Sequence, residues 1–196
     1  MRLFIAINLP SALQSALQAQ AAALEPVVRA VHAKVGWVRP DHYHLTLRFL
    51  GEFPEERVPD LGRALAESLE ETVAFDLRLQ GWGCFPTRGM PHTLWIGAAG
   101  PGGSLEGLGA GIQKALRRLD FADVKRSFHA HVTVGRVRFV KDGKRLRTIV
   151  SELPSSAPLP WRVDALDLMQ SVLHPEGPAY TCLKPIPLRE GGRPVL

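Results

Sequence analysis

One short pattern occurs twice in this chain of 196 residues, as HLTL at residues 44–47 and as HVTV at residues 131–134. In both copies polar and apolar residues alternate, which is the period of a β-strand. Strand side chains point alternately to opposite faces, so the His and Thr of each copy share one face, while the apolar residues face a core. The pattern therefore predicts two half-buried strands, each presenting His and Thr on its polar face.

The residues around the two copies follow a common plan, in which a strand and a helix precede the strand that carries the motif. This repeat predicts a duplicated α+β unit whose two lobes face each other across a cleft. The pairing of strands between the lobes stays open. We expect strands at 2–7, 34–39, 44–50, 73–80, 93–98, 131–140, 162–173 and 179–183, helices at 12–24, 55–70 and 104–119, helix caps at Ser11 and Ser104, and a β-hairpin turn at Asp142-Gly143.

Composition narrows the class of protein. Hydrophobic residues make up 45% of the chain and charged residues 22%, which is typical of a globular domain. The net charge of +5 favours an anionic partner such as phosphate or nucleic acid. Cys84 and Cys182 form neither a disulfide framework nor a metal-ligand spacing. No apolar stretch reaches the roughly 18 residues of a membrane span, so we expect a cytoplasmic protein with no membrane partner.

Paired histidines suit displacement at phosphorus, where the attacking and leaving oxygens lie on opposite sides of the phosphorus atom. One group must accept a proton from the nucleophile and another must donate one to the leaving oxygen. Histidine can do both because its pKa lies near 6.5. Threonine hydroxyls can donate to the non-bridging oxygens as negative charge builds there. The two motifs therefore indicate metal-independent acid-base chemistry on a phosphate ester.

Further segments match one family. They are RLFIAINLP at 2–10, Trp37-Val38, HLTLRFLG at 44–51, Phe85-Pro86, LWIG at 94–97, HVTVGR at 131–136, Ser171 and Tyr180. With these flanks the chain resembles the two-histidine (2H) phosphoesterase superfamily and, more closely, the bacterial RNA 2′,3′-cyclic phosphodiesterases, also called 2′-5′ RNA ligases. The likeness covers nearly the whole chain. Where many relatives have Pro directly before the second motif, this chain has Ala130.

The resemblance implies a single bilobal domain over residues 1–196, with two antiparallel sheets lining a central cleft and helices outside. It implies an enzyme that opens a terminal ribonucleoside 2′,3′-cyclic phosphate with water and leaves a 2′-phosphate, without a metal or other cofactor. His44 and His131 would divide the acid and base roles, with His131 as our preferred base, and Thr46 and Thr133 would bind the phosphate. The sequence does not decide which histidine is the base.

The same resemblance implies a partner, which is RNA with a 2′,3′-cyclic phosphate end, tRNA fragments included. We also expect the protein to be a monomer. Reversible 2′-5′ RNA ligase activity is a second expectation. Two other functions stay open. One is a phosphodiesterase for a small nucleotide such as ADP-ribose cyclic phosphate or 2′-5′ oligoadenylate, and the other is a non-catalytic RNA-binding module. His42 and His129 would also allow a metal site together with the motif histidines, but no acidic cluster accompanies them.

Two arginines are candidates for further phosphate contacts. Strict alternation turns Arg136 away from His131, but Gly135 permits a β-bulge that would turn it back. Alternation places Arg48 on the face of His44. A basic run over residues 136–147 either covers a solvated surface or contacts an RNA backbone. The aromatic residues that could stack on bases are Phe4, Trp37, Trp82, Phe85 and Tyr180, of which one or two are expected at the site.

Overall fold

A single antiparallel sheet organises the part of the chain that the structure describes. The computed structural model covers residues 1–121, 128–154, 157–175 and 177–191. The strand order is β7-β4-β5-β6-β3-β1-β8-β9, and β2 pairs with β6 beyond the point where β3 leaves it. The strands are β1 (Arg2–Asn8), β2 (Lys34–Trp37), β3 (His44–Glu52), β4 (Phe75–Phe85), β5 (Thr93–Ala99), β6 (His131–Phe139), β7 (Leu159–Val163), β8 (Ala165–His174) and β9 (Gly177–Pro187).

The sheet is narrowest between β3 and β6, where only Leu45 and Val132 are paired. This junction divides the sheet into one half built from β1, β3, β8 and β9 and another built from β2, β4, β5, β6 and β7. The expected α+β fold of antiparallel strands is therefore confirmed, and the two halves of the sheet form one continuous path.

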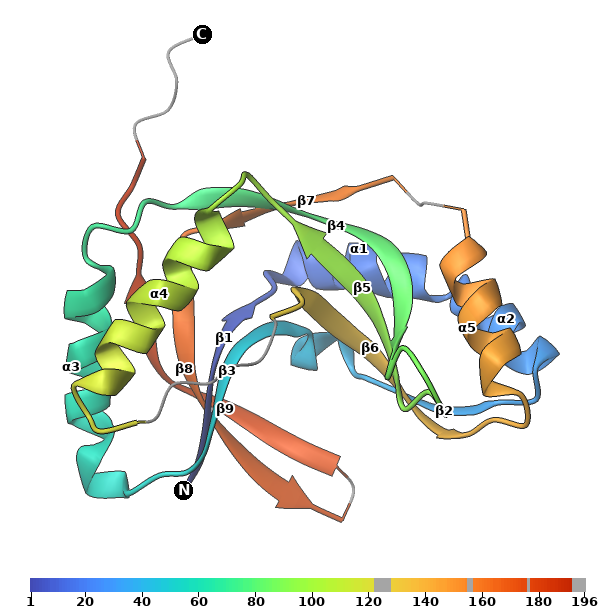
Figure 1. The fold of residues 1–196 in the computed structure, drawn as a ribbon, viewed down its shortest axis with the longest axis horizontal. Coiled ribbons are helices and arrows are strands. Elements are labelled where there is room, and N and C mark those ends of the chain that lie inside the picture. Colours follow the sequence, from blue (N-terminus) through green and yellow to red (C-terminus); the bar gives the residue numbers. More distant parts are fainter. Residues whose placement is uncertain (122–127, 155–156, 176, 192–196) are drawn as a thin grey trace, which may run out of the picture.

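Helices cover the outer sides of both halves, as Figure 1 shows, with α3 and α4 at one end of the molecule and α2 and α5 at the other. The helices α1 and α4 each cross from the half that contains the preceding strand to the other half: α1 follows β1 but contacts β7, and α4 follows β5 but packs against α3. These crossings interlock the two halves. The helices are α1 (Ser11–Ala21), α2 (Leu24–Ala30), α3 (Val58–Leu69), α4 (Ser104–Arg117) and α5 (Gly143–Glu152), with 3₁₀ turns η1 (Pro40–His42) and η2 (Glu55–Arg57).

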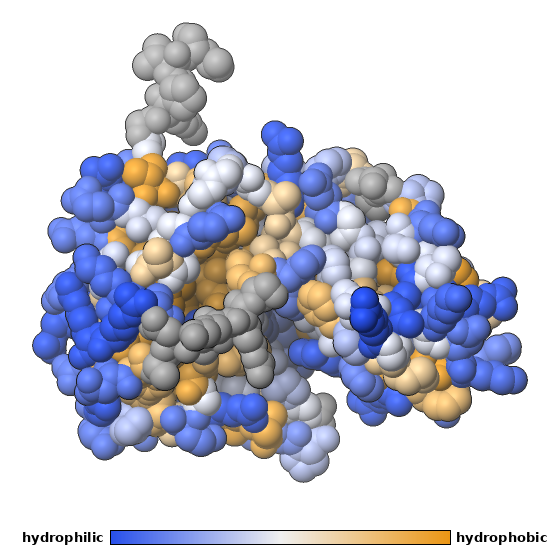
Figure 2. All heavy atoms as spheres, in the orientation of Figure 1, coloured by the Kyte–Doolittle hydropathy of each residue, from blue (hydrophilic) through white to orange (hydrophobic). Residues whose placement is uncertain are grey.

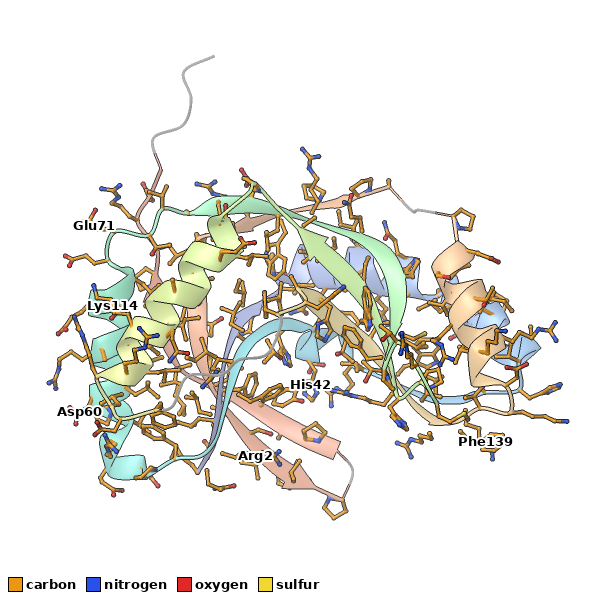
Figure 3. All side chains as sticks on the ribbon, in the orientation of Figure 1. Arg2, His42, Asp60, Glu71, Lys114 and Phe139 are labelled. Atoms are coloured by element: carbon orange, nitrogen blue, oxygen red, sulfur yellow. The ribbon has the colours of Figure 1, made fainter. Side chains whose placement is uncertain are left out.

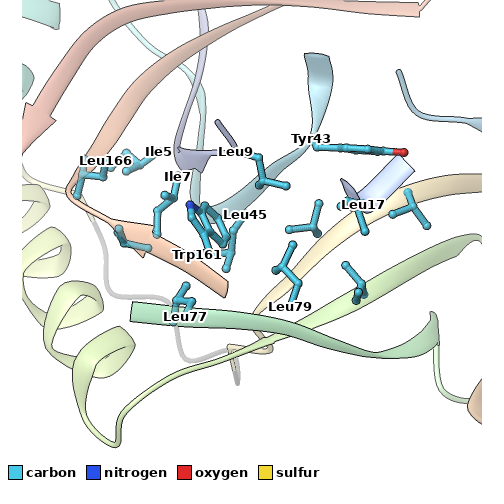
Figure 4. Close-up of a cluster of buried hydrophobic side chains, with 14 of the residues drawn as sticks. Ile5, Ile7, Leu9, Leu17, Tyr43, Leu45, Leu77, Leu79, Trp161 and Leu166 are labelled. Carbon is cyan, nitrogen blue, oxygen red and sulfur yellow. The ribbon is translucent and has the colours of Figure 1, made fainter. Parts of the chain in front are cut away.

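The core lies between the sheet and these helices. On α3, Leu61, Leu65 and Leu69 are fully buried, because residues four apart share one face of a helix. Figure 4 shows strand residues such as Leu77 and Leu79 turned into the same interior. Burying each such side chain stabilises the fold by about 1.5–3 kcal/mol. None of the described helices is long and apolar enough to cross a membrane.

The prediction of a β-hairpin at Asp142-Gly143 is wrong, because these residues begin helix α5. The Asp142 carboxylate accepts a hydrogen bond from the backbone N–H of Arg145 at 2.9 Å, which caps the helix. Leu146 and Val150, four residues apart, are both buried on the inner face of α5. Asp and Gly favour a turn locally, but here the helical spacing of the apolar residues that follow decides the structure.

Other boundaries differ by smaller amounts. The helix expected over 12–24 is divided into α1 and α2. Ser11 and Ser104 were expected as N-caps, but both are first residues of helices whose N-caps are Pro10 and Gly103, without a side-chain cap. The long strand expected over 162–173 is two strands, β7 and β8, which lie at different places in the sheet.

Candidate active site

The two motifs lie side by side at the junction of the two sheet halves. Leu45 and Val132 are paired across β3 and β6, and both are fully buried. Extending this antiparallel register by one residue in each direction sets His44 opposite Thr133, and Thr46 opposite His131. These four polar side chains are half-buried on the other face of the sheet. The structure thus brings together the four residues predicted from the repeated pattern.

Each motif histidine is held by a backbone carbonyl two residues earlier. Nδ1 of His44 lies 2.8 Å from the carbonyl oxygen of His42, and Nδ1 of His131 lies 2.7 Å from that of His129. A carbonyl oxygen can only accept, so each Nδ1 carries the proton and each Nε2 is left for a substrate. The two His-x-His pairs therefore orient the motif rings through the backbone. Among the described residues, no three metal-ligating side chains come together.

Aromatic rings surround the two motif histidines in a matching way. The ring of His44 lies 5.1 Å from that of Phe4 and 5.2 Å from that of Tyr180. The ring of His131 lies 4.9 Å from that of Phe85 and 6.0 Å from that of Trp95. Each imidazole therefore contacts one aromatic side chain from the adjacent strand and one from a strand further along the sheet, which hold its orientation and exclude water from one side.

Three of the five aromatic residues suggested by the sequence are at these histidines, namely Phe4, Phe85 and Tyr180. Trp82 is instead part of the buried core. The sequence reasoning missed Trp95, although it is an outward position on a predicted strand. Its indole lies against Gly83 on β4, where a Cβ would approach the ring within 2.2 Å. A glycine opposite a strand tryptophan is the signal that could have identified it.

Burial lowers the pKa of both motif histidines below their usual value. The hydrogen bonds to the carbonyls of His42 and His129 oppose this shift, because they favour the imidazolium form. The positive charge of Arg136 lowers both pKa values further, and the charge of His131 lowers the pKa of His44. Without a bound anion, the neutral form of both rings is therefore favoured near pH 7.

Arg136 reaches the histidine face through the predicted β-bulge. Between β5 and β6, Leu94 pairs with Gly135 but Trp95 pairs with Thr133, so one residue of β6 is left over. The Arg136 guanidinium donates from Nη1 to the hydroxyl of Thr93 at 3.0 Å. Arg136 is paired with Thr93, which lies two residues from Trp95 and so on the face where Trp95 approaches His131; Arg136 therefore lies on the side of the motif histidines. A bulge is therefore present next to Gly135, with Val134 as the extra residue.

Arg48 does not follow the predicted alternation. Between β1 and β3, Ala6 pairs with Thr46 but Ile5 pairs with Arg48, so Leu47 is an extra residue. Directly opposed residues share a face, and Ile5 is buried in the core. Arg48 therefore lies on the core side of β3, and the prediction that it faces the cleft beside His44 is wrong. A second bulge, which the sequence did not signal, causes the difference.

A depression of about 390 Å³ lies next to His131, on the side of β4 and β5. Trp95, Gly97 and His129 form the wall nearest to His131, which is paired with Gly97 across the strands. Figure 2 shows hydrophobic residues lining the hollow in the middle of the molecule and hydrophilic residues over much of its periphery. The depression thus lies beside the second motif. Figure 3 shows His42, whose carbonyl orients His44, near the centre of the structure.

An antiparallel sheet with two His-x-Thr pairs at its centre defines a two-histidine phosphoesterase. The family model described as LigT like Phosphoesterase matches residues 7–95 and 96–180, and the chain belongs to this family. A Thermus thermophilus protein named RNA 2′,3′-cyclic phosphodiesterase is 37% identical, with the match covering 98% of this chain and 93% of that protein.

Solved structures agree with this assignment. A crystal structure of a Thermus thermophilus protein is 31% identical, with a TM-score of 0.76 and coverage of 98% of this chain and 100% of the other. The structure of E. coli LigT complexed with 3′-AMP is 25% identical, with a TM-score of 0.70 and coverage of 95% of this chain and 97% of the other. The family resemblance drawn from the sequence is thus confirmed.

Proposed function

We propose that this chain is an RNA 2′,3′-cyclic phosphodiesterase, which opens a terminal cyclic phosphate with water and leaves a 2′-phosphate. The observation that carries the proposal is the matched orientation of two imidazoles, each with its Nδ1 proton on a carbonyl and its Nε2 free. The name of the curated Thermus thermophilus relative supports the same substrate. The two motifs come from what we interpret as a duplicated unit.

In the proposed reaction the water oxygen forms a bond to phosphorus while the bond from phosphorus to the 3′ oxygen breaks. Nε2 of His131 accepts the proton of the water, and Nε2 of His44, in its imidazolium form, donates a proton to the departing 3′ oxygen. The hydroxyls of Thr46 and Thr133 donate to the non-bridging oxygens. The reaction is balanced, because one proton is taken up and one is released.

The lowered histidine pKa values fit this division of roles. A base must be neutral before the reaction, and burial favours the neutral form of His131. The acid must be protonated, and a bound phosphate anion raises the pKa of His44 by placing negative charge beside it. Arg136 is the proposed third phosphate ligand, held in place by Thr93. Substrate binding thus helps to protonate the catalytic acid.

Reversible 2′-5′ RNA ligation is a second proposed activity of the same residues. A 5′ hydroxyl in the position of the attacking water would give a 2′-5′ phosphodiester, with the same bond to the 3′ oxygen broken. The depression beside His131 has room for part of a nucleotide next to the proposed base. Incubating the protein with an RNA that ends in a 5′ hydroxyl and an RNA that ends in a cyclic phosphate tests this activity.

The proposed hydrolysis is tested with an RNA that ends in a 2′,3′-cyclic phosphate, incubated with and without EDTA. We expect a 2′-phosphate product in both samples, identified by end analysis of the RNA. A 3′-phosphate would reverse the assignment of the leaving oxygen. If no product forms although the RNA binds, the non-catalytic module is the better description, and if only small cyclic nucleotides react, the RNA substrate is wrong.

A further inference from the structure

A row of basic side chains continues from the candidate site along β6. Beyond the bulge, Arg136 and Arg138 are exposed, while Val137 between them is buried. Alternation therefore places both guanidinium groups on the face that carries His131. Two residues of a strand span about 6.6 Å, which is comparable to the spacing of successive phosphates in an extended nucleic-acid strand.

The edge strand β2 extends this face. Gly36 is opposite Arg136, and the guanidinium of Arg138 lies over Gly36, where a Cβ would be 3.0 Å from its Nε. Because Gly36 has no side chain, the Arg138 guanidinium can lie over the sheet next to Arg136. Gly36 thus leaves room for the Arg138 guanidinium on the same surface as Arg136.

An exposed aromatic ring and another cation complete the same face. Lys34 of β2 is paired with Phe139 at the end of β6. The neighbouring Val35 is paired with the buried Val137, and the register shifts between these two pairs, so Arg138 is an extra residue of β6. Arg138 and Phe139 are therefore together opposite Lys34, on the face away from Val35 and Val137. Phe139 is 55% exposed, and Figure 3 shows it at the end of the molecule away from His42. We call the surface formed by Lys34, Arg136, Arg138 and Phe139 the β6 track.

Within the part of the chain that the structure describes, the cations of this surface have no carboxylate as ion-pair partner. Elsewhere, exposed arginines form ion pairs, such as Arg118 with Glu67 and Arg162 with Asp76. In the described ranges of the chain, no salt bridge involves a cation of the β6 track or Lys141, which follows it. The nearby Asp142 is engaged in capping α5. An excess of positive charge beside an exposed phenyl ring suits single-stranded nucleic acid, because cations follow the backbone and aromatic rings stack on bases.

We propose that the β6 track binds the body of a single-stranded RNA whose terminal cyclic phosphate lies between His44 and His131. This inference rests on the proposed function and specifies its substrate class: an RNA strand of several nucleotides, in preference to a free cyclic mononucleotide. A mononucleotide would contact Arg136 at most, whereas a strand would extend to Arg138 and Phe139. The row of cations along β6 sets the direction in which the bound RNA leaves the histidines.

The test compares two triple variants by the anisotropy of a fluorescent RNA of about ten nucleotides that ends in a 2′-phosphate. One variant replaces Lys34, Arg138 and Lys141 with Gln. The matched control replaces Arg63, Lys114 and Arg118, which are exposed on α3, α4 and the residue after α4. Both variants lose the same charge. Binding is measured between roughly 50 and 200 mM salt, because counterion release makes affinity depend on salt.

We expect the track variant to bind the RNA about tenfold more weakly than the control. Each lost phosphate contact lowers the slope of log affinity against log salt by roughly 0.7 for a single strand, so the slope should fall by about 2. In turnover, kcat/KM for a cyclic phosphate on the RNA, divided by that for a cyclic mononucleotide, should fall by a similar factor. If the two variants have equal affinity for the RNA and an equal salt slope, the proposal that the β6 track binds RNA is wrong.

The two proposals fail in distinguishable ways, because RNA binding is measured without catalysis. If the unmodified protein hydrolyses neither substrate but its RNA binding is weakened only in the track variant, the proposed function is wrong and the β6 track stands. If both substrates are hydrolysed but the track variant binds RNA like the control, the function stands and the β6 track is wrong.

Discussion

Leu45 of β3 and Val132 of β6 are directly opposed, and in the described residues they are the sole pair that joins these two strands. Both side chains are fully buried, so each motif strand is anchored from its apolar face. The neighbouring residues of each motif project from the other face, where His44 and Thr133 come together from different halves of the sheet. One apolar contact therefore positions a polar site assembled from two distant parts of the chain.

Replacing Leu45 with Ala should destabilise the protein by about 2–5 kcal/mol, because it leaves a cavity at the junction of the sheet halves. Combined with Val132→Ala, the loss should differ from the sum of the single losses by about 0.5–3 kcal/mol, since the residues are in contact. Urea unfolding measures these energies. Val172→Ala, at an exposed position on β8, should change stability by less than about 0.5 kcal/mol and serves as the control. Strictly additive energies would contradict this coupling.

Replacing either His44 or His131 with Ala should lower kcat for RNA cyclic phosphate hydrolysis by about 10²–10⁴-fold, because each removes one proton-transfer group. The double variant should be little worse than the single ones, since the two groups act in one step. His174→Ala, at the exposed end of β8, is the matched control. A single variant that retains full kcat would remove that histidine from the mechanism.

The pH profile of kcat/KM should be bell-shaped, with one neutral and one protonated histidine required. Burial lowers the pKa of both imidazoles. Both limbs of the profile should therefore lie at lower pH than they would for histidines with their usual pKa. Replacing Arg136 with Gln removes a nearby positive charge, and both limbs should move to higher pH as activity falls. Arg63→Gln should leave the limbs in place. If the limbs of the Arg136 variant move to lower pH, the charge of Arg136 does not lower the pKa of the histidines as proposed.

The hydrogen bond from Arg136 to the hydroxyl of Thr93 gives a separate test of positioning. Thr93→Val keeps the shape of the side chain but leaves the guanidinium without this acceptor. We expect kcat/KM to fall by about 10- to 100-fold, in line with the roughly 1.5–3 kcal/mol of a hydrogen bond to a charged group. Thr93→Ser keeps the hydroxyl and should restore most of the activity. If the Thr93→Val and Thr93→Ser variants have the same kcat/KM, Thr93 has only a packing role.

Much of the candidate site could be predicted from local sequence. The alternation in the two motifs correctly places His44, Thr46, His131 and Thr133 on a polar face, since the two-residue period of a strand is a local property. The glycine before Arg136 correctly indicated a bulge, because glycine tolerates the irregular backbone there. The family could also be identified, from segments spread along the whole chain.

Only the tertiary structure decided the rest, because it depends on contacts between residues far apart in the chain. The bulge at Leu47 turns Arg48 to the core side, and it arises from pairing with β1, which the sequence of β3 does not reveal. Trp95 joins the site because Gly83 of another strand leaves space for its ring. Likewise, the residues after Asp142 form helix α5 because their apolar side chains are buried against β4 and α2. Local preferences are a few tenths to about 1 kcal/mol per residue, and burial of a single leucine outweighs them.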